Sequence, residues 1–560
     1  MVKKSVSYCL FAVALTASTT LAAASVPVTQ PWASLTTSQW REDLKYFADN
    51  APLKHRNFYH AMTQAEFQDE IHRFDTAMPT LSPEQIVVEF IRLGAMIQDA
   101  HSSVSLAVLK LPYMPVRFVE FDDGVYVESA DKAHAEMVGA KLVSVGSIGW
   151  KEAMAKIDPL VSDDAGNDGE KRTYAAHDYL NVPFILKGIG LSDSSQHATF
   201  MLEKAGKRRS YTLDASVPSA GFSVADLVFD PIPEGWVSAR ASGPSIPLAR
   251  THPDQAYWFE PVQQHEAVYV SLRAMVNMPG PTLADFAKQL GDYLGSHDVK
   301  RLIVDLRGNP GGDNTLLRPL LVTLIRANTN YRGGLWVLIS HKTHSAAQNF
   351  VNRLESYTDA IFVGEPTSEN VNFYGDPTGI ELPNSHIPVY LSALWWQDKD
   401  PRDHRTATAP EIAVPQSFEQ LVAGKDPALE IALTEPAPRP LEDLVKDAAP
   451  NGAAALMGVY KQYVSDSRHA YIADTEVRLN RAGYALLADN KPAQAVLVFQ
   501  LCADTHPQSD NAFESLGEGL EAAGDKNGAI GAYTRSLQLN PGNHDAAGAL
   551  KRLAAAASPK

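Results

Sequence analysis

The chain has 560 residues, of which 45% are hydrophobic and 20% charged, so it is too long for a single hydrophobic core and too apolar for a disordered protein. Its 49 basic and 65 acidic side chains give a formal net charge of −16 without any lysine- or arginine-rich run, which argues against a nucleic-acid-binding protein. The two cysteines, Cys9 and Cys502, allow neither a disulfide framework nor a cysteine-based metal site.

The first 24 residues are typical of an export signal. Lys3 and Lys4 precede an apolar stretch that ends at Leu21, and the small residues Ala22 to Ala24 suit a cleavage site. The alternative is a membrane anchor, but serine and threonine interrupt the apolar stretch, and no later segment has the roughly 20 apolar residues that a span needs. We therefore expect an exported protein, periplasmic or secreted, with no membrane span after removal of residues 1–24.

The remainder divides into four predicted domains. Residues 25–105 have helical apolar spacing and form an N-terminal helical domain. Residues 106–228 alternate apolar and polar side chains between turns, which predicts a small β-rich domain. Residues 229–440 alternate between strand and helix patterns, and residues 441–560 form a helical repeat region.

The third domain carries the pattern of a parallel α/β sheet. The expected elements, in chain order, are a strand at Arg301–Leu306, a helix at Thr315–Ala327, a strand at Leu335–Ile339, a helix at Ser345–Ser356 and a strand at Ala360–Val363. In such sheets, functional residues lie in loops at the carboxyl ends of the strands. The informative loops are therefore 307–314 and 340–344.

The C-terminal region contains a repeat of 34 residues. Four positions recur as glycine, alanine, an aromatic residue and proline: Gly483 and Gly517, Ala495 and Ala529, Phe499 and Tyr533, Pro507 and Pro541. This period is typical of tetratricopeptide repeats, in which paired helices stack on one another. Such a module offers a groove for a peptide or protein partner.

The first candidate site is a glycine-rich loop directly after a predicted strand, with Gly308, Gly311 and Gly312. Backbone N–H groups in such a loop can hold an anion or a developing oxyanion. A phosphate site is disfavoured because neither Gly-Lys-Ser/Thr nor G-x-G-x-x-G is present. The alternative is a tight strand-to-helix turn with no chemistry.

The second candidate site is Ser345, at a predicted strand-to-helix junction followed by small residues. A nucleophilic serine needs this position, because the helix N-terminus stabilises negative charge and Ala346 leaves its backbone N–H accessible. The alternative is that Ser345 only caps its helix.

The third candidate site is the end of a helix that carries Asp99, His101 and Ser102. A histidine between a carboxylate and a hydroxyl suits a general base, and the alternative is a structural or solvent-exposed histidine.

Taken in order, these segments resemble the tail-specific, or C-terminal processing, serine peptidases. The matching segments are Asp-Ala-His-Ser (99–102), Val-Asp-Leu-Arg-Gly-Asn-Pro-Gly-Gly (304–312), Thr-His-Ser-Ala-Ala-Gln (343–348), Val-Gly-Glu-Pro-Thr (363–367), Pro-Glu-Ile-Ala-Val (410–414) and Gly-Lys-Asp-Pro-Ala-Leu (424–429). The resemblance implies an α/β fold with a crotonase-like parallel-sheet core and a degenerate, PDZ-like β-rich insert. It also implies that Ser345 is the nucleophile and that the oxyanion hole uses the N–H groups of Gly312 and Ala346, beside Gly311.

The family offers two kinds of base. One branch uses a lysine after the nucleophile helix, but no lysine lies between Ser345 and Lys399. The branch that includes the tricorn protease core uses an upstream histidine, and His101 fits that role, with Ser102 as the adjacent hydroxyl.

The acid that orients the histidine has two candidates. Asp403 is the first, because it lies just before Pro410-Glu411-Ile412, near where that branch places its glutamate, and Asp99 is the second.

We therefore predict an exported serine peptidase that acts on peptides or proteins, requires no metal or cofactor and forms an acyl-enzyme on Ser345. With an unperturbed histidine as base, its activity would fall below a pH of about 6.5. The rival hypothesis is a non-catalytic protein that binds a ligand or peptide through the same core and the repeats.

Overall fold

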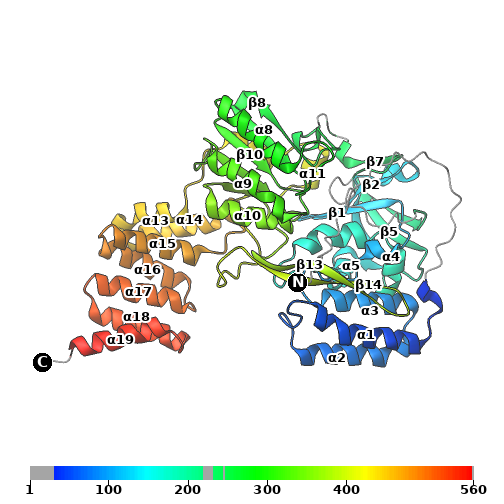
Figure 1. Cartoon of the computed structure of the whole chain (residues 1–560), viewed down its shortest axis with the longest axis horizontal. Coiled ribbons are helices and arrows are strands. Elements are labelled where there is room, and N and C mark those ends of the chain that lie inside the picture. Colours follow the sequence, from blue (N-terminus) through cyan, green and yellow to red (C-terminus); the bar gives the residue numbers. More distant parts are fainter. Residues whose placement is uncertain (1–30, 218–230, 242, 244–245, 558–560) are drawn as a thin grey trace, which may run out of the picture.

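The computed structural model describes residues 31–217, 231–241, 243 and 246–557, and the predicted export signal lies outside these residues. Figure 1 shows an N-terminal region of helices and strands, a region with helices packed on a second sheet, and a helical tail that extends to one side. Among the described residues, no helix has both the length and the apolar character needed to cross a membrane.

The N-terminal region combines helices with an antiparallel sheet. Its helices are α1 (Thr37–Lys54), α2 (Gln64–Ala77), α3 (Pro83–Ala95), α4 (Leu106–Leu109), α5 (Trp150–Ile157), a π-helix (Lys171–Tyr179) and α6 (Pro183–Gly188). Its strands are β1 (Val116–Phe121), β2 (Gly124–Asp131), β3 (Lys141–Val145), β4 (Ile148–Gly149), β5 (His197–Lys204), β6 (Lys207–Asp214) and β7 (Trp236–Ser238). The main order is β1-β2-β3-β5-β6. A single hydrophobic core contains side chains from both sides of residue 105, where the first predicted domain ends. The helices and this sheet therefore pack as one unit.

The second sheet has six strands in the order β15-β12-β11-β10-β9-β8. They are β8 (Tyr257–Val262), β9 (Ala267–Leu272), β10 (Arg301–Asp305), β11 (Leu335–Ile339), β12 (Ile361–Gly364) and β15 (Ile412–Ala413). All neighbouring pairs are parallel except β8 and β9. The mixed α/β class is confirmed, and the three strands predicted in this region are β10, β11 and β12.

Both faces of this sheet are covered, which is why its strands are apolar throughout rather than alternating. Helices α8 (Leu283–Ser296), α9 (Leu317–Arg326) and α10 (Ala346–Tyr357) pack on one face, around Val304 and Val337. Helix α12 (Pro427–Thr434) packs on the other, around Ile303 and Leu338. The short helix α11 (Phe418–Val422) adds its side chains to the N-terminal core.

A long hairpin connects the two regions. Its strands, β13 (Asn372–Glu381) and β14 (Pro388–Gln397), reach from the second sheet to the N-terminal helices (Figure 1). At its tip, the backbone N–H groups of Asn384 and Ser385 donate to the buried Asp43 carboxylate of α1. The hairpin therefore fixes the N-terminal region against the second sheet.

The tail is a stack of helices, compatible with the predicted tetratricopeptide repeats. They are α13 (Leu441–Ala448), α14 (Ala453–Ser465), α15 (Thr475–Ala488), α16 (Pro492–Thr505), α17 (Asp510–Ala522), α18 (Lys526–Leu539) and α19 (His544–Ala557). A Cβ atom at Gly483 would lie 2.3 Å from the Phe499 ring, and one at Gly517 2.6 Å from the Tyr533 ring. The recurring glycines thus let each aromatic side chain pack against the preceding helix.

The packing of α13 predicts how chains that are truncated before and after this helix behave. Leu441 and Val445 are fully buried in the core of the tail. A chain that ends at Pro440 is therefore expected to be folded and monomeric, whereas one that ends at Ala448 keeps α13 with its apolar face exposed and is expected to aggregate. Size-exclusion chromatography and thermal unfolding of the two chains test this. Equal behaviour of both would contradict the boundary at 440/441.

Candidate active site

Ser345 lies in a strained turn between β11 and α10. Its backbone has φ 55° and ψ −123°, outside the regions that residues with a side chain normally adopt. Its side chain makes no capping hydrogen bond to α10, so helix capping does not explain the residue. A Cβ atom at Gly311 would lie 2.5 Å from Ser345 Cβ, so only glycine allows the two loops to approach this closely.

His101 reaches Ser345 across 244 positions of sequence, with Nε2 3.0 Å from Ser345 Oγ. Strand β14 brings it there, because the backbones of Ser103 and Tyr390 exchange two hydrogen bonds of 3.0 and 2.9 Å. The His101 side chain is only 12% exposed. A serine hydroxyl and a buried imidazole at this distance have the geometry of a nucleophile and its base.

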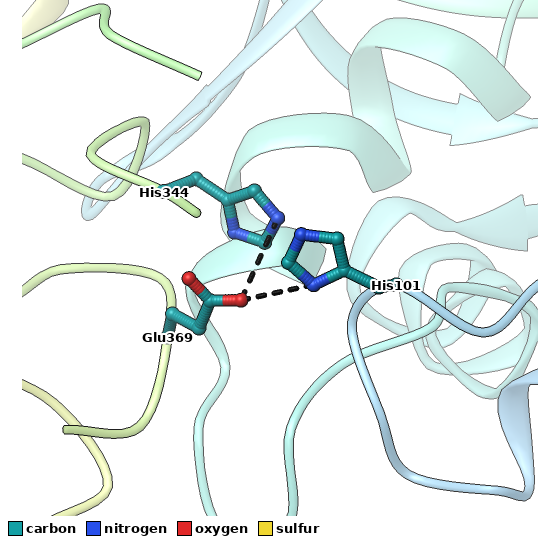
Figure 2. Close-up of side chains that lie close together, drawn as sticks. All are labelled: His101, His344 and Glu369. Atoms are coloured by element: carbon teal, nitrogen blue, oxygen red, sulfur yellow. Dashed lines mark ion pairs between the residues drawn. The ribbon is translucent and has the colours of Figure 1, made fainter. Parts of the chain in front are cut away.

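Glu369 supplies the carboxylate behind the histidine. It is fully buried in the loop after β12, with Oε1 3.0 Å from His101 Nδ1 (Figure 2). The imidazole N–H is not aligned with the carboxylate oxygen, and the contact is an ion pair rather than a linear hydrogen bond. The other oxygen, Oε2, accepts the backbone N–H of Ser345 at 2.5 Å.

This carboxylate governs the charge of the histidine. Burial by itself lowers the pKa of His101, but the carboxylates of Glu369, Asp99 and Asp164, with Glu369 first among them, together outweigh burial and raise that pKa to about 9. The expected midpoint of the pH dependence, which lies near 6.5 for an unperturbed histidine, is therefore corrected upward.

Asp403, the first candidate for the acid that orients His101, belongs to a different group of ion pairs. Its carboxylate pairs with Arg405, whose Nη2 lies 2.8 Å away, and Arg405 also binds Glu355. Two bidentate contacts to one guanidinium stabilise Asp403 in that network and hold it away from the histidine. The expectation that Asp403 orients His101 is corrected: Glu369 occupies that position.

Asp99 and Ser102 support the histidine loop without contacting its ring. Asp99 Oδ1 accepts the backbone N–H of His101, and Asp99 Oδ2 accepts hydrogen bonds from Ser102 Oγ at 2.6 Å and from His55 Nε2 at 2.8 Å. Ser102 Oγ in turn accepts the N–H of Ser392 in β14. The prediction that Ser102 is a hydroxyl beside the reacting groups is thus corrected. Ser102 is buried and links the histidine loop to the hairpin.

The hydrogen bonds of the two loops show which of the predicted oxyanion donors already have an acceptor. The N–H of Gly311 is committed to Asn309 Oδ1 at 2.9 Å, which removes it as a donor. Within the described part of the chain, the N–H groups of Gly312 and Ala346 have no protein acceptor. The loop is held by two hydrogen bonds between Met275 and the backbone of Gly311 and Asp313. Gly312 and Ala346 therefore remain the candidate donors.

The lysine alternative does not have the required geometry. Lys399 Nζ pairs with Glu355 at 2.5 Å and donates to Ser356 Oγ, near the C-terminal end of α10. Ser345 lies at the opposite end of that helix, roughly 15 Å away at the rise of 1.5 Å per residue.

His344 and Asp164 complete the site. The His344 ring stacks on the His101 ring with centroids 4.6 Å apart, and burial lowers the pKa of His344 to about 4. Asp164 accepts the backbone N–H groups of Ala100 and Asn370, the neighbours of His101 and Glu369 in sequence. Burial raises the pKa of Asp164 well above its usual value. His101, His344 and Glu369 are also close enough to share a metal ion.

Sequence reasoning missed Glu369, His344 and Asp164. A signal for Glu369 was present, because it follows the third predicted parallel strand, at whose carboxyl end functional residues gather. The sequence contains no comparable signal for Asp164.

No described protein family matches the sequence, and no curated protein matches it. Similar solved structures include mature CPAF complexed with lactacystin (14% identity, TM-score 0.49, 71% of this chain and 97% of that one). Others are the photosystem II D1 C-terminal processing protease (13%, 0.32, 70% and 99%) and the tricorn protease (12%, 0.32, 71% and 36%). At such identities and TM-scores, the activity of this chain has to be inferred from the site itself.

Proposed function

We propose that the protein is a serine peptidase that works through an acyl-enzyme on Ser345. The observation that carries the proposal is the line of contacts from Ser345 Oγ to His101 Nε2 and from His101 Nδ1 to Glu369 Oε1, each 3.0 Å long. Nucleophile, base and orienting acid in this order form a constellation that recurs on unrelated folds.

In the proposed mechanism, Ser345 Oγ attacks the scissile carbonyl while His101 Nε2 takes its proton. The Glu369 carboxylate stabilises the imidazolium that forms, and the N–H groups of Gly312 and Ala346 stabilise the oxyanion. His101 then protonates the leaving amine, and a water molecule hydrolyses the acyl-enzyme with His101 again as base. Losing one oxyanion donor typically costs about 3–4 kcal/mol of transition-state stabilisation.

The proposal also includes four features of the chain that were inferred from the sequence and from the family resemblance. They are export of the chain after removal of residues 1–24, a crotonase-like core, a degenerate PDZ-like insert and tetratricopeptide repeats that bind a protein partner. The antiparallel sheet in the N-terminal region is compatible with the insert, and the stacked helices in the tail are compatible with the repeats.

The raised pKa of His101 predicts an alkaline pH profile. Only neutral His101 can accept the serine proton, and with a pKa of about 9 most molecules carry the charged form at pH 7. The value of kcat/KM is therefore expected to rise about tenfold per pH unit below pH 9 and to level off above it. The measurement is a pH–rate profile with a small chromogenic peptide in EDTA. A plateau that is already reached at pH 7 would contradict the charge coupling between Glu369 and His101.

Labelling with a fluorophosphonate probe tests the proposal against the binding-protein rival. An activated serine is expected to react, and peptide mass spectrometry should place the adduct on Ser345. The control is His101→Ala, which keeps Ser345 but removes its base and should label far more slowly. No labelling of either protein would support the non-catalytic alternative, and equal labelling of both would show that His101 is not the base.

A further inference from the structure

A second use of the active-site cluster follows from three potential metal-ligand atoms that lie close together. His101, His344 and Glu369 each offer one ligand atom, and these three atoms lie within 4.8 Å of one another (Figure 2). We propose that they bind a divalent transition-metal ion of the Zn²⁺ type and that the bound ion inhibits the peptidase. The inhibitory part rests on the proposed function, whereas the metal site does not.

The ligand set and its spacing suit zinc. Two histidines and one carboxylate form a recurrent three-residue zinc set, with bonds of about 2.0–2.2 Å, so that two ligand atoms of a tetrahedral ion lie roughly 3.3 Å apart. Glu369 Oε1 lies 3.0 Å from His101 Nδ1 and 3.8 Å from His344 Nε2. The two rings are stacked at 24°, so a rotation of the His344 ring is needed to bring its nitrogen lone pair onto the ion.

The second observation is a buried carboxylate oxygen that pairs with His101 without an aligned hydrogen bond. Glu369 is fully buried, and neither its Oε1 nor His101 Nδ1 has an aligned hydrogen-bond partner among the described residues. A buried acceptor without an aligned donor is costly, and a cation between these atoms would satisfy both.

The outer contacts also match those of a metal-binding histidine. His344 Nδ1 lies 3.3 Å from Glu170 Oε1 and 3.3 Å from Ser368 Oγ. A ligating histidine usually directs its second nitrogen to a carboxylate or another polar group, which fixes the ring. Glu369 Oε2 is likewise held by the N–H of Ser345.

Inhibition follows from the tautomer of His101. A base for Ser345 needs its proton on Nδ1 and a lone pair on Nε2. A metal ion on Nδ1 instead takes the Nδ1 lone pair, so the proton of the neutral ring is on Nε2 and points to Ser345 Oγ. His101 can then only donate to Ser345, and the proton transfer that starts the reaction is blocked.

Metal binding is tested on the EDTA-treated, dialysed full-length protein and its Ser345→Ala variant by calorimetric titration with ZnCl₂. Absorption bands of tetrahedral Co²⁺ provide a second measurement. His344→Phe keeps a ring against His101 but removes the ligand, and it should weaken binding by more than about 100-fold, as should His344→Ala. The matched control is His341→Ala, in the same loop but outside the cluster, which should bind as the parent does.

Activity is then compared for each protein with ZnCl₂ and with EDTA. The parent and His341→Ala should lose activity with zinc and regain it with EDTA. For His344→Phe, the ratio of activity with zinc to activity with EDTA should stay near one, whatever its basal rate. Zinc binding that is absent, or equal in His344→Phe and His341→Ala, overturns the site. Activation by zinc overturns the inhibitory role. Zinc binding by a protein that cleaves no peptide overturns the proposed peptidase and leaves the metal site standing.

Discussion

Replacement of Ser345 by alanine is expected to lower kcat by about 10⁴-fold or more, because the nucleophile acts as a unit with its base. The fold should be unaffected, since Ser345 Oγ caps no helix and its described hydrogen bond is to His101. The variant is compared with the parent by kcat on a peptide substrate and by thermal unfolding.

The matched control is Ser340→Ala. Ser340 lies in the same loop, where its Oγ accepts the N–H of Lys342. It should keep near-parental activity, because it touches none of the reacting groups. A Ser345→Ala variant that still cleaves as the parent does would show that another residue is the nucleophile.

Replacement of Glu369 by glutamine is expected to lower kcat by roughly 10⁴-fold at neutral pH with little change in KM. The amide keeps the size of the side chain but can donate to His101 Nδ1. Donation there favours the tautomer with its proton on Nε2, which cannot accept the proton of Ser345. The loss belongs to the chemical step because Glu369 is buried behind the histidine.

Asp403→Asn makes the same chemical change in the Arg405 network and is the matched control. It should leave kcat within a few-fold of the parent and lower the melting temperature slightly, since a partly exposed ion pair contributes about 0–1 kcal/mol to stability. Loss of activity in Asp403→Asn with an active Glu369→Gln would return the orienting role to Asp403.

Much of the site follows from local patterns. Apolar runs and helical spacing placed β10, β11, β12, α9 and α10 within a few residues of their bounds. The rule that functional residues follow parallel strands directed attention to the loops with Gly311, Gly312 and Ser345. His101 was predicted from its segment and the family resemblance.

Only the tertiary structure decided which acid serves the histidine. Chain order favoured Asp403, but β14 docks the His101 loop where Glu369, not Asp403, is buried beside the ring. The same packing turned Ser102 into a link to the hairpin.

The physical reason is the range of the interactions. Strand and helix periods are set by residues a few positions apart, so the sequence by itself determines them. The partner of a buried charge, and the pKa of about 9 that His101 acquires, depend on which groups share a desolvated volume, and here they come from residues 101, 345 and 369. The sequence by itself therefore determined the strands, the helices and the candidate nucleophile, and the packing of the hairpin between the two regions decided the rest of the site.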